Sequence, residues 1–121
     1  AVELALLLPV LLLILLGCLD LGQVFAVRMA LVNGSREGAR YASLYPTDTA
    51  GIISRARADI LSEGLTEAAL RIQVSTPNGT AGGSPIVVTA FYAVPLTTSY
   101  LFANRPLDVS ARTQMVIVGG Q

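Results

Sequence analysis

The feature that most constrains this chain is an uninterrupted apolar run near its start. From Leu4 to Leu19 there is no charged residue, and fourteen of these sixteen residues are apolar and neither proline nor glycine. At a rise of about 1.5 Å per residue, a helix over this run and its flanks approaches the ~30 Å hydrocarbon core of a bilayer. A helix in a soluble domain is rarely apolar on every side for this long. The run therefore predicts a membrane segment, or a helix that leaves the membrane to be buried in an assembly of its own kind.

Composition excludes several classes of function. Of the 121 residues, eight are arginine and eight are acidic, with no lysine or histidine, so the net charge is zero. Proteins that bind nucleic acid through broad electrostatic contacts need a basic surface, which this balance does not supply. Because Cys18 is the single cysteine, no intrachain disulfide can form; this cysteine lies within the apolar run.

The residues that enzymes use for catalysis are missing or scattered. Without histidine there is no imidazole base, and one cysteine in an apolar run is neither a redox pair nor a metal site. The carboxylates are spread too widely along the chain to suggest a catalytic pair. We therefore expect no catalytic, cofactor-binding or metal-binding residues, and a protein that is not an enzyme.

Two helices are predicted. The first continues beyond the apolar run to about Leu44, where Tyr45-Pro46 ends it, because the residue before a proline disfavours helical geometry. The second runs from Thr49 to Ser62, with Asp48 or Thr47 as its cap. Its apolar residues recur at helical spacing, which predicts one face packed against the first helix or a sheet.

After the second helix, the apolar residues alternate with a period of two, which is typical of half-buried strands. The predicted strands are residues 70–75, 86–94 and 107–117. A turn-rich loop, 77–85, separates the first two, while 96–106 connects the last two as a short helix or a loop capping the sheet. The prediction is an α+β fold with a long hydrophobic helix, a short helix and a small, mostly antiparallel sheet. The helix over residues 1–44 and a small head over 45–121 would be its two parts.

Glu3 stands at the edge of the apolar run, where a carboxylate is costly unless it has a partner. One interpretation is a helix N-terminal acid, favoured by the macrodipole and placed at headgroup level. The other is an ion pair with the α-amino group of a neighbouring subunit. Pro9 and Gly17 weaken the helix interior and mark places where it could bend or locally melt on moving from lipid into an assembly.

The first third of the chain resembles a known family. The resemblance rests on Val2-Glu3, the leucine run with Pro9, Gly17, the Asp20-x-Gly22 pair and the segment Ser35-Arg36-Glu37-Gly38-Ala39-Arg40-Tyr41-Ala42. In this combination, residues 1–44 resemble TadE-like proteins, which are pilin-like or pseudopilin proteins of the tight-adherence (Flp, type IVc) pilus systems.

The resemblance implies a precursor whose basic leader is removed by a prepilin peptidase just before the apolar helix. It also implies that Glu3 matches the acidic residue that pilins place near the mature N-terminus, with the cleavage site left open. The implied partners are other copies of the chain, the pilus assembly machinery, and the inner membrane before assembly. We expect subunit contacts to involve five residues: Glu3, Pro9, Gly17, Asp20 and Gly22.

Three functional hypotheses follow. The chain is a structural subunit of a pilus-like extracellular filament, a minor pseudopilin that initiates or caps a Tad pilus from the membrane, or a single-pass anchor for a small binding domain. The glycine-containing helix and its continuity to Leu44 favour assembly, since small residues allow close helix packing. The sequon Asn78-Gly79-Thr80, in the predicted loop, is a possible glycosylation site.

Overall fold

A computed structural model describes residues 2–95 and 106–118. Helix α1 spans Val2–Leu44 and α2 spans Thr49–Leu61. A short 3₁₀ helix, η1 (Glu67–Ala69), precedes strand β1 (Leu70–Ser75), which is followed by β2 (Pro85–Val94) and β3 (Leu107–Val116). In the part of the chain described, this is the predicted α+β, pilin-like fold.

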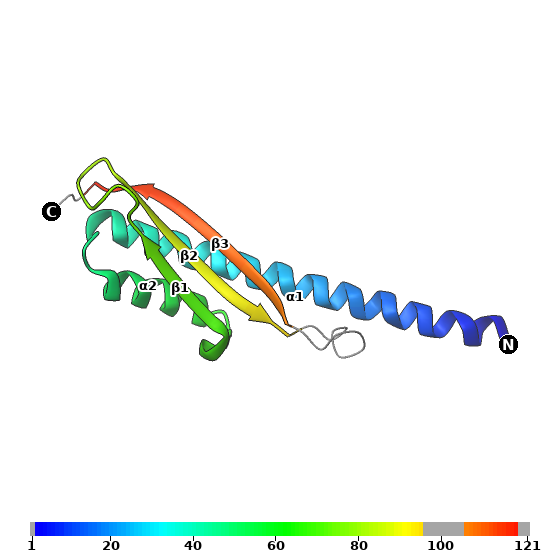
Figure 1. The fold of residues 1–121 in the computed structure, drawn as a ribbon. Coiled ribbons are helices and arrows are strands. Elements are labelled where there is room, and N and C mark those ends of the chain that lie inside the picture. The colour runs from blue at the N-terminus through cyan, green and yellow to red at the C-terminus, as the bar shows by residue number, and fades with distance from the viewer. Residues whose placement is uncertain (1, 96–105, 119–121) are drawn as a thin grey trace.

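The sheet has the order β1-β2-β3, and both neighbouring pairs are antiparallel. Both helices pack on one face of the sheet, with α1 against β2 and β3 and α2 against α1 and β1. Figure 1 shows α1 running along the sheet and then extending well beyond its end toward the N-terminus. The molecule is therefore a two-layer head with one helix that continues out of it.

The alternation in β2 explains the core. Every second side chain from Ile86 to Val94 points toward the helices and is at most 7% exposed. These side chains pack with Leu31 of α1 and Ile60 of α2, both fully buried. The core thus begins about halfway along α1, and the distal half of that helix is part of the folded head.

The chain between the helices turns as expected. Asp48 is the N-cap of α2, and its Oδ1 accepts a hydrogen bond of 3.1 Å from the backbone N–H of Gly51, satisfying a donor that the first helical turn leaves free. At the distal end of α1, the carbonyl of Ser43 accepts a 2.8 Å bond from the N–H of Val118, just after β3. A backbone hydrogen bond therefore joins the chain just after β3 to the end of α1.

Small differences from the prediction occur at element ends. The second helix ends at Leu61, with Ser62 as its cap; β2 begins one residue earlier, at Pro85, and β3 ends one earlier, at Val116. The 3₁₀ helix before β1 was not predicted. Residues 96–105 of the predicted connection over 96–106, and the last three residues of the chain, lie outside the described residues.

Candidate assembly surface

The N-terminal half of α1 is exposed on every side. The large apolar side chains from Val2 to Leu15 are 45% to 75% exposed, and none of the most apolar 18-residue window is buried within the chain. We call residues 2–19 the apolar segment. Among the described helices, α1 is the one long and apolar enough to cross a membrane. A surface this apolar is not stable in water, so lipid or protein must cover it.

Apolar exposure does not stop at the end of this segment. Leu21, Phe25 and Met29 follow at intervals of four residues, and they are 71%, 67% and 48% exposed. Residues spaced by four lie on the same side of a helix. We call these three residues the outer stripe. It runs along α1 on the side away from the head, opposite residues such as Val27 that are buried in the core.

The structure places the first two predicted assembly residues on the free part of α1. Glu3 is exposed in the first helical turn, where a carboxylate is favoured by the helix dipole. Pro9 is also exposed, and α1 continues through it. Both residues are thus available to a neighbouring molecule, and neither is held by the head.

The glycines of α1 divide into two groups. A Cβ added at Gly17 or Gly22 would meet no atom of the chain within 4 Å. A Cβ at Gly34 would collide with the side chain of Ile60, and one at Gly38 would lie 3.0 Å from the Cβ of Ala56. The second pair lets α1 and α2 approach closely within one molecule. The first pair has no such role in the described part of the chain, which leaves it open to contacts with another molecule.

The two remaining predicted residues, Asp20 and Asn78, are not part of the exposed apolar surface of α1. Asp20 is only 5% exposed and sits where α1 enters the head, so its carboxylate is largely covered by its own chain. Asn78 is exposed in the loop between β1 and β2, and its carbonyl accepts a 3.5 Å hydrogen bond from the Ser84 hydroxyl. The loop is therefore accessible for modification or antibody binding, far along the chain from the apolar segment.

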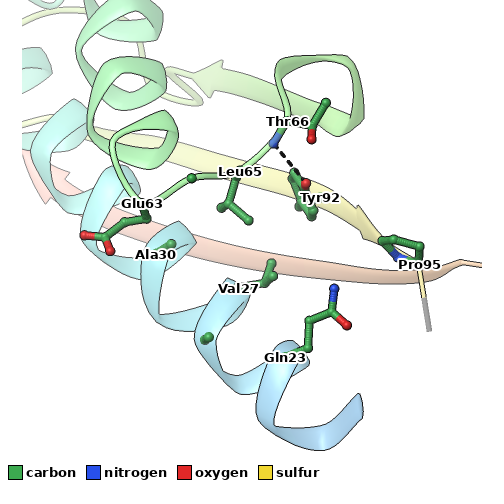
Figure 2. Close-up of a pocket in the computed structure, with 10 residues that line it drawn as sticks. Gln23, Val27, Ala30, Glu63, Leu65, Thr66, Tyr92 and Pro95 are labelled. Carbon is green, nitrogen blue, oxygen red and sulfur yellow. Dashed lines mark hydrogen bonds between the residues drawn. The ribbon is translucent and has the colours of Figure 1, made fainter. Parts of the chain in front are cut away.

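Sequence reasoning missed a pocket at the base of the head. It has a volume of about 380 Å³ and lies between α1, the loop after α2 and the end of β2. Figure 2 shows Gln23 and Val27 of α1 facing Tyr92 and Pro95, with Leu65 of the loop over them. The hydroxyl of Tyr92 accepts a 3.1 Å hydrogen bond from the N–H of Thr66, which fixes the loop against the strand. No periodic pattern reveals such a pocket, because its walls come from three distant segments.

A polar cluster lies at the end of the head opposite the pocket. The Tyr41 hydroxyl donates a 2.7 Å hydrogen bond to Oδ2 of Asp48, and the Arg55 guanidinium lies 5.0 Å from the centre of the Tyr41 ring. The hydrogen bond from Tyr41, supported by the N–H of Gly51, holds the pKa of the Asp48 carboxyl below its usual value. The same hydrogen bond raises the pKa of Tyr41 above 10.0. This cluster fixes the start of α2 against α1.

Within residues 2–95 and 106–118, no group of three or more His, Cys, Asp or Glu side chains could hold a metal ion. Across the same ranges, the ion pair is that of Arg57 with Glu67, at 3.5 Å and with both side chains more than a third exposed. Such an exposed pair contributes little to stability. The surface that distinguishes this chain is apolar and lies on α1.

Comparison with known proteins agrees with the features of α1. The family model described as TadE-like protein matches residues 1–40, which cover the apolar segment, the outer stripe and the two close-packed glycines. No curated protein and no solved structure matched the chain. Residues 1–40, a third of the chain, are thus similar to the TadE-like protein family.

Proposed function

We propose that this protein is a structural subunit of a pilus-like extracellular filament and that it polymerises through its N-terminal helix rather than acting as an enzyme. One observation carries the proposal: the apolar segment continues directly from a folded head and is exposed on every side. Before assembly, the inner (cytoplasmic) membrane covers this segment. In the filament, the segments of neighbouring copies cover one another, and the heads face water.

In this proposal, Glu3 determines the axial register between neighbouring copies in the filament. Its exposed carboxylate lies in the first turn of a helix that is otherwise apolar for the next sixteen residues. Moving it into an apolar filament core without a partner would be costly. A pair with the α-amino group of a neighbouring copy neutralises both charges and fixes the axial register. The prepilin peptidase that frees this amino group and the pilus assembly machinery are the further partners of the proposal.

The outer stripe favours a filament over a simple anchor. Residues 2–19 alone give a helix of about 27 Å, close to the bilayer core. An anchor has no need of three further exposed apolar side chains beside its head, at Leu21, Phe25 and Met29. In a filament these side chains extend the surface that neighbouring copies share. The open positions Gly17 and Gly22 permit close approach of another helix along the same stretch.

A minor pseudopilin is the second candidate. The TadE-like match over residues 1–40 supports it, since a protein that starts or caps a Tad pilus from the membrane uses the same helix. The two candidates differ in the number of copies in each filament and in their location. A minor component is confined to filament ends or the membrane, whereas a structural subunit is distributed along the whole filament.

Electron microscopy of the sheared extracellular fraction tests the proposal. An antibody against the loop around Asn78 provides the label, because this loop is exposed and distant from the proposed contacts. Label along the entire length of thin filaments is the expected result. Label confined to filament tips would identify a minor component, and label confined to membrane fragments would identify an anchored domain; either result would overturn the filament proposal.

A further inference from the structure

The outer stripe and the pocket at the base of the head lie at the same position along the axis of α1, on opposite sides of that helix. Phe25 and Val27 are two residues apart, so their directions differ by about 200° and their positions along the axis by only ~3 Å. Phe25 is 67% exposed and faces away from the head, whereas Val27 is 4% exposed and lines the pocket. Two copies packed side by side at equal height can therefore place Phe25 of one copy against the pocket of the other.

The chemistry of the two surfaces matches. Val27, Leu65 and the ring of Tyr92 give the pocket an apolar part (Figure 2). Polar side chains form the rest of its lining: Gln23, Glu63 and Thr66. A volume of about 380 Å³ is large enough for an aromatic side chain. Phe25 is the largest side chain of the outer stripe, and about two thirds of it is left uncovered by its own chain.

The charges beside these surfaces are also complementary. Arg28 follows Phe25 by three residues, so it lies about 60° around the helix and ~4.5 Å further along it. Glu63 lines the pocket beside Ala30, on the same distal side of the pocket (Figure 2). Both side chains are exposed, and within the described residues neither has a partner of opposite charge or an aromatic contact. With Phe25 in the pocket, Arg28 of one copy comes to the level of Glu63 of the other.

We propose that the pocket at the base of each head receives Phe25 of a second copy, with Arg28 of that copy paired to Glu63. This inference rests on the proposed filament function and names the contact that links neighbouring heads. Because the two surfaces differ and lie on opposite sides of one helix, the contact is heterologous. Each added copy presents a new Phe25 and a new pocket, so the assembly grows without closing into a dimer.

Disulfide formation between paired positions tests the contact. Filament-producing cells would carry the full-length chain with Cys18→Ser, Arg28→Cys and Glu63→Cys. All three of these positions are exposed. Mild oxidation is expected to yield a series of covalent dimers, trimers and higher oligomers on a non-reducing gel. The matched control pairs Glu63→Cys with Arg36→Cys, an exposed arginine ~12 Å further along α1, and is expected to give at least tenfold less cross-linking.

Charge exchange provides a second readout with little risk to folding. Arg28→Glu or Glu63→Arg alone places like charges together and is expected to lower filament yield several-fold. The double variant, Arg28→Glu with Glu63→Arg, is expected to restore at least half of the yield, whereas Arg36→Glu with Glu63→Arg is not.

The outcomes separate the two proposals. Filaments that form normally but give neither cross-linking nor restoration would overturn the Phe25 contact and leave the filament function intact; the pocket would then hold a lipid chain or another protein. If the unaltered chain forms no filaments, both proposals are wrong.

Discussion

The hydroxyl oxygens of Ser35 in α1 and Thr113 in β3 lie 2.7 Å apart. The Ser35 hydroxyl also lies 3.0 Å from the carbonyl of Val32, to which it donates its proton. Its bond to Thr113 must therefore use the threonine proton. Ser35 is fully buried and Thr113 is half-buried, so this pair is a polar link between the helix and the sheet beside the apolar core.

Replacing Ser35 with alanine should destabilise the head. The change leaves the Thr113 hydroxyl without its partner, which we expect to lower the free energy of unfolding by about 1 kcal/mol. Chemical denaturation of the full chain in detergent micelles, followed by circular dichroism, measures it. The double variant Ser35→Ala with Thr113→Val should lose less than the sum of the two single variants. Strict additivity would show that the two hydroxyls do not interact.

The two groups of glycines should respond in opposite ways to alanine. Gly34→Ala places a Cβ against Ile60 and, at 3.1 Å, near the carbonyl of Ala56; overpacking of this kind should cost about 1–3 kcal/mol of stability. Gly22→Ala meets no atom of the chain and should stabilise the isolated protein by ~0.5–1 kcal/mol through helix propensity. Thermal unfolding of both variants compares them directly. A loss of stability in Gly22→Ala equal to that in Gly34→Ala would contradict the packing described.

The hydrogen bond between Tyr41 and Asp48 should give stability a defined pH window. The pKa of Asp48 is lowered below 3.8 in the folded chain, so its contribution is present above pH 3.8 and is lost as the pH falls through the folded value. The pKa of Tyr41 is raised above 10.0, so its contribution is present below pH 10 and is lost as the pH rises through the folded value.

Melting temperatures measured across both limits check this window, with Tyr41→Phe and Asp48→Asn as comparisons. Tyr41→Phe should remove the alkaline loss assigned to this residue and reduce the acid loss, because Asp48 would keep only the N–H of Gly51 as a donor. Melting curves for Tyr41→Phe that match the unaltered chain at every pH would show that the contact contributes nothing.

Glu3→Ala should separate insertion from assembly. The change removes a charge from an apolar helix, so insertion into the membrane should be unimpaired. Filament yield should fall by at least tenfold, because the α-amino group of the neighbouring copy would lose its partner. Membrane fractionation and a filament count from the sheared fraction give the two readouts. A normal filament yield from this variant would remove Glu3 from the proposal.

The elements of this fold follow from local sequence signals. The leucine run, the Tyr45-Pro46 stop and the Asp48 cap set the two helices, while period-two alternation sets the strands to within one residue at each end. These signals are local, so periodicity and turn chemistry reveal them. The 3₁₀ helix at Glu67–Ala69 carries too few residues to produce a pattern.

The site was predictable only in part. The sequence alone reveals the apolar segment and Glu3. It does not reveal that Gly34 packs against another helix of its own chain whereas Gly22 is open. That difference depends on where α2 crosses α1, which brings Ile60 against Gly34 and leaves Gly22 open. The pocket beside Tyr92 has the same origin, since it joins residues that are about seventy positions apart.

The unbroken course of α1 has a mechanical consequence. With 43 residues and a rise of ~1.5 Å each, the helix is about 65 Å long and links the head to the apolar segment without a loop. A pulling force on the head therefore passes along the backbone hydrogen bonds of the helix. Those bonds are fewest at Pro9, which has no N–H to donate. Under tension, extension should begin within the apolar segment, where unwinding lengthens the molecule while the head and its contacts stay folded.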